Sequence, residues 1–208
     1  TFGGGLIFFI TEYTNTGTMA GEGLFAKGMQ SLFQSVIART AGFNSINLSA
    51  MRDTSAFFMI LLMFAGGSPG STAGGLKTTT VGVLFASTFS IIRGENKTIL
   101  FNKRVPTDTI SKSLALVMIS SMLVMIISLI LTVTENFAFI DVLFEVVSAY
   151  ATVGVTRGLT PNLSTFGRIL ITLTMYAGRI GPLTMAFAFG KKRSKSRIDF
   201  PDANISVG

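Results

Sequence analysis

The sequence of 208 residues contains no cysteine, no histidine and no tryptophan, and only 13% of its residues are charged. An ordinary soluble domain carries about 25% charged residues. The missing cysteine excludes disulfides, thiol nucleophiles and thiolate metal sites, and the missing histidine removes the commonest catalytic base and metal ligand. A membrane-embedded enzyme is therefore disfavoured. What is present, 49% hydrophobic residues with a mean hydropathy of +0.60, indicates an integral membrane protein.

One uncharged run, residues 114–133, matches the ~20 residues that a helix needs to cross a bilayer. The other apolar runs are interrupted. Residues 52–92 contain a glycine-rich stretch, and residues 163–190 are interrupted at Gly178 and Arg179. Both segments are predicted to be broken membrane helices, and such breaks are tolerated only against protein or a water-filled cavity. The breaks are therefore candidates for function.

The net charge of +7 is concentrated in two places, the connection 93–112 and the tail 191–208. Basic residues at the ends of apolar segments mark cytoplasmic loops, so we expect both regions in the cytoplasm and no nucleic-acid partner. The basic tail could also contact anionic membrane lipid. Because the chain starts at Thr1 inside an apolar stretch, we expect a fragment of a longer protein without a visible signal peptide.

With the connection and the tail both in the cytoplasm, residues 114–133 cross the membrane outward and residues 163–190 provide the one full crossing back. Residues 137–151 are too short to span the bilayer and are predicted to be a re-entrant half-helix that enters from outside. Residues 24–38 precede the broken segment 52–92 in the same way. Three acidic residues, Asp53, Asp141 and Glu145, are expected near the outer surface, mainly as solvated groups.

The chain contains an internal repeat with an offset of 112 residues. Residues 40–44 correspond to 152–156, and residues 63–67 correspond to 175–179. The repeated unit is a span, a half-helix, a turn that contains Thr-x-Gly, and a broken span. Both copies have the same predicted orientation, which is typical of a parallel repeat. This argues against many secondary transporters of organic solutes, whose repeats are inverted.

The two turns are candidate ion filters. A half-helix that ends within the membrane directs the negative end of its dipole inward and favours a cation. Extended backbone after it would present carbonyl oxygens, which replace the hydration shell of potassium. The sequence Thr-Val-Gly-Val is similar to potassium-channel filters, and one such turn alone would be an ordinary surface turn. The candidate filter residues are Thr40, Ala41, Gly42 and Phe43 in one copy and Thr152, Val153, Gly154 and Val155 in the other.

Four patches, residues 38–44, 66–75, 151–155 and 178–182, together resemble the Trk/Ktr/HKT superfamily, most closely the membrane subunits of bacterial Ktr systems. The resemblance implies an all-α membrane protein with four potassium-channel-like repeats around a pseudo-fourfold pore. It implies potassium uptake, often with sodium, by a homodimer bound to a cytosolic nucleotide-binding regulatory ring of the KtrA type. Residues 1–92 would be an incomplete third repeat and residues 113–190 the fourth. A secondary transporter of another cation or small solute is the alternative.

The glycine-rich stretch is a candidate gate. It begins about ten to twelve helical residues after the first turn, or about 15–18 Å, and the resemblance implies a loop that blocks the pore below the filter. A phosphate-loop reading fails because the spacing to the lysine is off by one residue and no strand precedes it. The candidate gate residues are Gly66, Gly67, Ser68, Pro69, Gly70, Ser71, Thr72, Ala73, Gly74, Gly75 and Lys77.

Arg179 is a charge within an apolar segment, and such charges usually face a cavity or a partner. One interpretation is that Arg179 contacts the glycine-rich stretch or repels cations, so that both together form the barrier. The other is that Arg179 extends to the membrane surface or caps carbonyl groups freed by Gly181 and Pro182. The family resemblance favours the first interpretation.

Overall fold

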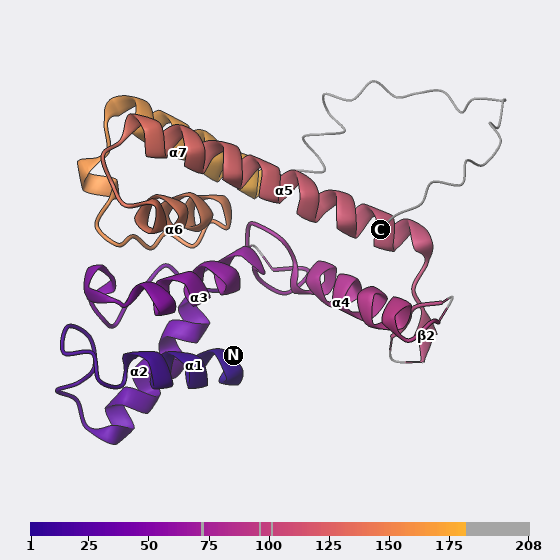
Figure 1. The fold of residues 1–208 in the computed structure, drawn as a ribbon, viewed down its shortest axis with the longest axis horizontal. Coiled ribbons are helices and arrows are strands. Elements are labelled where there is room, and N and C mark those ends of the chain that lie inside the picture. Colours follow the sequence, from indigo (N-terminus) through magenta and orange to yellow (C-terminus); the bar gives the residue numbers. More distant parts are fainter. Residues whose placement is uncertain (72, 96, 101, 182–208) are drawn as a thin grey trace.

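A computed structural model describes residues 1–71, 73–95, 97–100 and 102–181 (Figure 1). The predicted continuation of the last span, residues 182–190, and the basic tail, residues 191–208, lie outside these described residues, as does Thr72. The helices are α1 (Phe2–Glu12), α2 (Leu24–Ile37), α3 (Asp53–Phe64), α4 (Thr78–Ile92), α5 (Thr107–Thr134), α6 (Phe139–Tyr150) and α7 (Thr165–Ile180), with short 3-10 turns at Leu48–Ala50 and Thr160–Asn162.

A two-stranded antiparallel hairpin, β1 (Ile99–Leu100) and β2 (Lys103–Arg104), lies in the connection between α4 and α5. The all-helical expectation did not include it. In this hairpin Ile99 pairs with Arg104 and Leu100 with Lys103. The described chain is otherwise mostly helical.

Among the described residues, α5 is the one helix that is long and apolar enough to cross a membrane. It contains the predicted span 114–133 and begins directly after Pro106. Its 28 residues extend about 42 Å at 1.5 Å per residue, which exceeds the ~30 Å hydrocarbon core. Helices α1, α3 and α4 are apolar but shorter.

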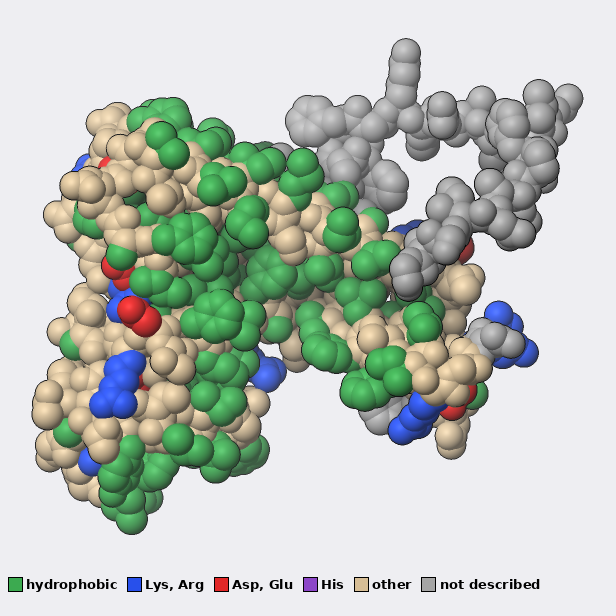
Figure 2. All heavy atoms as spheres, in the orientation of Figure 1, with side chains coloured by type: hydrophobic (Ala, Val, Ile, Leu, Met, Phe, Trp, Pro, Cys, Tyr) green, Lys and Arg blue, Asp and Glu red, His purple; other side chains and the backbone are tan. Residues whose placement is uncertain are grey.

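The packing of α5 is the reverse of that in a soluble helix. Its buried face includes Ser113, Ser120 and Ser128, whereas large apolar side chains such as Met118 and Met122 are exposed. Small residues at helix contacts allow close approach and are typical of helix packing in membranes. Figure 2 shows apolar side chains over much of the surface. This arrangement fits a lipid environment better than water.

The helices form two groups. Helix α1 packs against α2 and α3, and α6 packs against α5 and α7 (Figure 1). The two groups meet where α3 packs against α6, and α4 extends away to pack against α5. The tyrosine at the end of α6 is fully buried, and its hydroxyl lies 2.6 Å from the Ser120 hydroxyl of α5 in a hydrogen bond.

In each group, a buried carboxylate at the end of the first helix caps the start of the last helix. Glu135, which follows α5, accepts hydrogen bonds from the backbone N–H and the hydroxyl of Ser164, the N-cap of α7. Glu12 in α1 accepts from the N–H of Arg52, the N-cap of α3, and from the hydroxyl of Ser55. A negative charge at a helix N-terminus is stabilising. Glu12 and Glu135 are not separated by the repeat offset, because the linker of residues 13–23 is longer than the linker of residues 135–138.

We expect Glu135→Gln in the full-length subunit to destabilise the fold by about 1.5–3 kcal/mol, because hydrogen bonds to a charged group contribute about that much. Thermal unfolding of the purified protein in detergent measures the effect. Glu22→Gln is the matched control, because Glu22 is an exposed carboxylate in the linker after α1. Equal unfolding temperatures for the two variants would contradict the capping role.

Candidate functional site

Two turns with the same backbone geometry follow the short helices α2 and α6. In the first turn, residues 40–43, φ is 73° at Thr40 and 75° at Gly42. In the second turn, residues 152–155, φ is 55° at Thr152 and 82° at Gly154. A β-branched residue with positive φ is a genuine outlier. Two outliers at the repeat offset therefore mark a conformation that both halves of the chain maintain.

This geometry differs from the extended strand expected from the sequence. The residues between the outliers, Ala41 and Val153, have ordinary negative φ, so the sign of φ alternates along both turns. Alternating signs rotate successive peptide planes toward the same side, whereas carbonyl groups of an ordinary strand point alternately to opposite sides. Strained backbone of this kind is a reason to suspect function. The turns can thus direct several carbonyl oxygens to one side.

The two turns lie next to each other. A Cβ atom on Gly42 would lie 3.2 Å from the carbonyl oxygen of Val153. Each turn begins within three residues of the C-terminal end of its helix, α2 at Ile37 and α6 at Tyr150. The C-terminal end of a helix carries a partial negative charge of about half an electron. The structure therefore brings the two sequence-predicted filter segments together at two helix ends of the same sign.

The glycine-rich loop, residues 66–75, contacts the second turn and the end of α7. The N–H of Gly74 donates to the Thr152 hydroxyl oxygen at 3.0 Å, and the N–H of Gly75 donates to the carbonyl of Gly178 at 3.4 Å. A Cβ on Gly74 would lie 2.6 Å from that hydroxyl oxygen, and a Cβ on Gly178 only 1.8 Å from the carbonyl oxygen of Tyr150. Glycine is required where three backbone segments approach this closely.

Hydrogen bonds across its base hold the loop in a closed shape. The N–H of Thr78 donates to the carbonyl of Gly67 at 3.0 Å. The ammonium of Lys77 donates to the carbonyl of Ala73 and, at 3.4 Å, to that of Ser71. The Lys77 ammonium therefore satisfies carbonyl groups of the loop itself.

Helix α7 continues through Gly178 and Arg179, where the sequence predicted its interruption, and ends at Ile180. The break comes at Gly181, whose φ of 91° leaves the helical region. Arg179 is therefore in the last helical turn, exposed, and next to the residue that bonds Gly75. The structure places Arg179 beside the loop by chain position, and its role in a barrier stays a prediction.

The three acidic residues expected to be solvated have specific partners. Glu145 is buried in α6 and accepts a hydrogen bond from the Thr160 hydroxyl. Asp53 and Asp141 both form ion pairs with Arg157. Sequence reasoning overlooked Arg157, because nothing at the corresponding position of the first copy marks it. The only available signal was its place two residues after the second turn.

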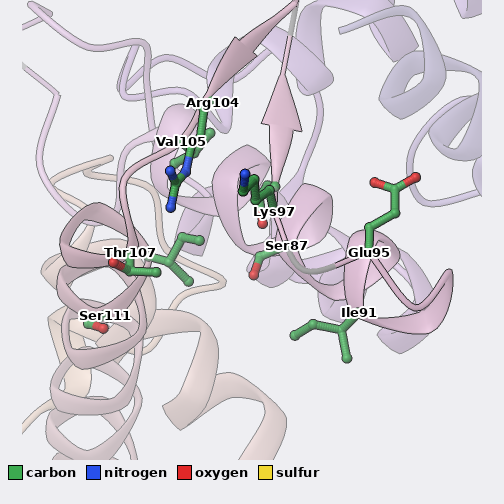
Figure 3. A pocket seen from close by; sticks show the side chains of 10 residues that line it. Ser87, Ile91, Glu95, Lys97, Arg104, Val105, Thr107 and Ser111 are labelled. Carbon is green, nitrogen blue, oxygen red and sulfur yellow. The ribbon is translucent and has the colours of Figure 1, made fainter.

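A separate hollow lies far along the chain from the turns, at the hairpin. It has a volume of about 250 Å³ and lies between α4, the hairpin and the start of α5. Figure 3 shows Lys97 and Arg104 directed toward it. No cluster of acidic residues that could hold a metal ion occurs within the described part of the chain.

Comparisons with known proteins find similar cation transport proteins. The family model of TrkH, described as a cation transport protein, matches residues 6–198. The chain is 41% identical over 203 residues to the Ktr system potassium uptake protein B of Bacillus subtilis, covering 98% of this chain and 45% of that protein. It is 34% identical over 213 residues to the potassium/sodium uptake protein NtpJ of Enterococcus hirae, covering 99% of this chain and 47% of that protein.

The fold is similar to the crystal structure of the potassium transporter TrkH from Vibrio parahaemolyticus, with a TM-score of 0.75 and 17% identity. That likeness covers 90% of this chain and 42% of the other chain. The chain thus spans about half the length of the relatives that it matches. The resemblance inferred from the sequence patches is confirmed, and the relatives are ion transporters by name.

We expect Gly178→Ala to destabilise the full-length subunit by at least about 1–3 kcal/mol, the usual cost of overpacking, because the added methyl group meets rigid backbone of α6. Thermal unfolding in detergent measures the change. Gly82→Ala is the matched control, since nothing lies within 4 Å of its added Cβ in α4 and alanine favours a helix. The close contact would be wrong if Gly178→Ala were as stable as Gly82→Ala.

Proposed function

The chain belongs to the TrkH family of cation transport proteins, and we propose that it supplies part of a selective potassium pore in a membrane uptake system. The observation that carries the proposal is the pair of adjacent turns with alternating φ, each at the end of a short helix. Residues 40–43 and 152–155 are the proposed filter. Potassium is the transported ion, and sodium is proposed as a second ion because the relative NtpJ is a potassium/sodium uptake protein.

The proposed mechanism follows from the backbone. Carbonyl oxygens on one side of each turn replace the water around a potassium ion, and the negative helix ends of α2 and α6 favour a cation there. Gly42 and Gly154 provide the positive φ that keeps the oxygens aligned. A complete ring requires more turns than the two in this chain.

We propose that the full-length subunit has four such repeats around a pseudo-fourfold pore. Residues 1–92 would form the incomplete third repeat, 93–112 a cytoplasmic connection, 113–190 the fourth repeat and 191–208 a cytoplasmic tail. The lengths of the relatives support this division, since the chain spans 45% of two of them. The basic connection supports a multi-pass protein of the bacterial plasma membrane with a cytoplasmic C-terminus.

The name Ktr system, carried by three relatives, supports a multi-subunit assembly. We propose a homodimer with a cytosolic nucleotide-binding ring of the KtrA type. The exposed apolar side chains of α5 support contact with membrane lipid. A secondary transporter of another solute has no specific observation in its favour.

The glycine-rich loop is proposed as the gate. Its contact with Thr152, at the start of the second turn, supports this role, since we propose that an ion leaves the filter past Thr152. Small residues and internal hydrogen bonds give it a closed shape that can move as a unit. We propose that Arg179, one residue after the contact with Gly75, adds a positive charge to this barrier.

We expect Gly154→Ser to lower the potassium-to-sodium flux ratio of the full-length subunit in liposomes about tenfold or more. Serine has space at this position, but the positive φ costs about 1–2 kcal/mol for a non-glycine residue, and about 1.4 kcal/mol corresponds to a factor of ten. Gly21→Ser is the matched control, at a loop glycine with ordinary φ and open space. If both variants keep the wild-type ratio while folded, residues 152–155 are not the filter.

We expect Arg179→Ala to raise the rate of potassium uptake, because it removes a positive charge beside the barrier. The measurement is potassium flux into liposomes that contain the full-length subunit. Arg168→Ala tests for a general effect of removing a cation from the same helix, since Arg168 is exposed near the start of α7. Unchanged flux in a well-folded Arg179→Ala protein would remove Arg179 from the proposed barrier.

A further inference from the structure

Arg157 joins the two helix groups directly above the second turn. Its guanidinium NH2 donates to the carbonyl oxygen of Met51 at 2.9 Å and lies 3.1 Å from a carboxylate oxygen of Asp53, at the start of α3. Its NH1 lies 2.9 Å from a carboxylate oxygen of Asp141, in the first turn of α6. One side chain from the segment after the second turn thus contacts both groups.

The guanidinium is held firmly. Its side chain is 8% exposed, against 31% for Asp141 and 74% for Asp53. A buried cation needs its partners, since removing one of them leaves an uncompensated charge. The pair with Asp141 is better shielded from water, although the NH1 atom that faces Asp141 makes no hydrogen bond within the described residues. Asp53 accepts a hydrogen bond from NH2, but it is exposed and water screens that pair. The fork of the guanidinium suits several partners at once, which a single ammonium group does not.

Arg157 belongs to a polar framework that holds the outer end of the second turn. The Ser148 hydroxyl donates to the carbonyl of Val155 at 2.6 Å and accepts from its N–H at 3.0 Å. The hydroxyl of Thr160 donates to Glu145. Ser148 and Glu145 are three residues apart on α6 and so lie on one face of that helix. The segment from Val155 to Thr160 is thus fixed to α6 and, through Arg157, to α3.

The first turn lacks this framework. The positions 112 residues before Glu145, Ser148 and Arg157 are Phe33, Val36 and Ser45, which carry no charge. The last residue of the first turn, Phe43, is 71% exposed. The two turns share their backbone geometry but differ in how their outer ends are held. Arg157 links the segment after the fixed turn to the start of α3 in the other helix group.

We propose that Arg157 is a positioning residue for ion selectivity: it fixes the outer end of the second turn, and so determines how well the pore discriminates potassium from the smaller sodium ion. This inference rests on the proposed function of residues 152–155 as a filter. When Arg157 is removed, the end of the turn is released from α3. Its oxygens can then close around sodium, because only a held backbone keeps them at the spacing for potassium.

The test compares potassium and sodium flux through the full-length subunit in liposomes. We expect Arg157→Gln to lower the potassium-to-sodium ratio about tenfold, which corresponds to about 1.4 kcal/mol, while total cation flux continues. Arg157→Lys should recover part of the ratio, since it restores the charge but not the fork. Arg52→Gln is the matched control, because the Arg52 guanidinium donates hydrogen bonds to Thr11 and Thr14, which belong to its own helix group.

Asp141→Asn provides a second route if Arg157→Gln does not fold. This variant keeps the guanidinium and removes its better-buried partner, so it should lower the ratio in the same direction and by less. A ratio equal to wild type in every folded variant overturns the proposal. Lower apparent potassium affinity with an unchanged ratio also overturns it, because that result indicates an electrostatic effect on ion entry only.

The wild-type measurement separates the hypothesis that residues 152–155 are the filter from the hypothesis that Arg157 positions them. If the wild-type subunit does not prefer potassium, the proposed filter fails before Arg157 is considered. If the wild type prefers potassium and Gly154→Ser loses this preference while Arg157→Gln keeps it, the filter stands and the role of Arg157 is wrong. Loss of the preference in both variants, with Arg52→Gln unchanged, supports the inference.

Discussion

The rest of the site depends on the close approach of three backbone segments: the end of α6, the glycine-rich loop and the last turns of α7. Gly74, Gly75 and Gly178 permit this approach, and a Cβ at Gly178 would overlap the carbonyl of Tyr150. Because no side chains separate the segments, the loop lies directly beneath the second turn and bonds to the Thr152 hydroxyl. The position of the turn, the shape of the loop and the path of α7 are therefore coupled.

Much of this architecture was predictable from the sequence. The uncharged run in α5, the short helices α2 and α6, and the interruption after α3 all follow from the lengths and breaks of apolar segments. The turns were predictable because Thr-x-Gly recurs at one offset. Their alternating φ was not, because threonine gives no signal for a positive φ and only the surrounding fold maintains it.

The sequence also did not predict the polar contacts between distant segments. Glu12 and Glu135 have the same capping role, but linkers of different length remove them from the repeat offset. Arg157 forms ion pairs with Asp53, more than a hundred positions before it, and with Asp141, sixteen positions before it. Sequence spacing does not predict such pairs. The end of α7 was misplaced because Gly178 looked like a helix breaker, whereas it serves a close helix contact and Gly181 ends the helix.

The difference in length between α5 and the other helices has a consequence for biosynthesis. At 28 residues, α5 is the one described helix that can partition into a bilayer on its apolar character alone. Helices α3 and α7, with 12 and 16 residues, are too short to cross the bilayer alone, so their backbone ends need protein partners within the membrane. We therefore expect α5 to enter the membrane independently during translation, and the broken segments to reach their final depth by assembling against it.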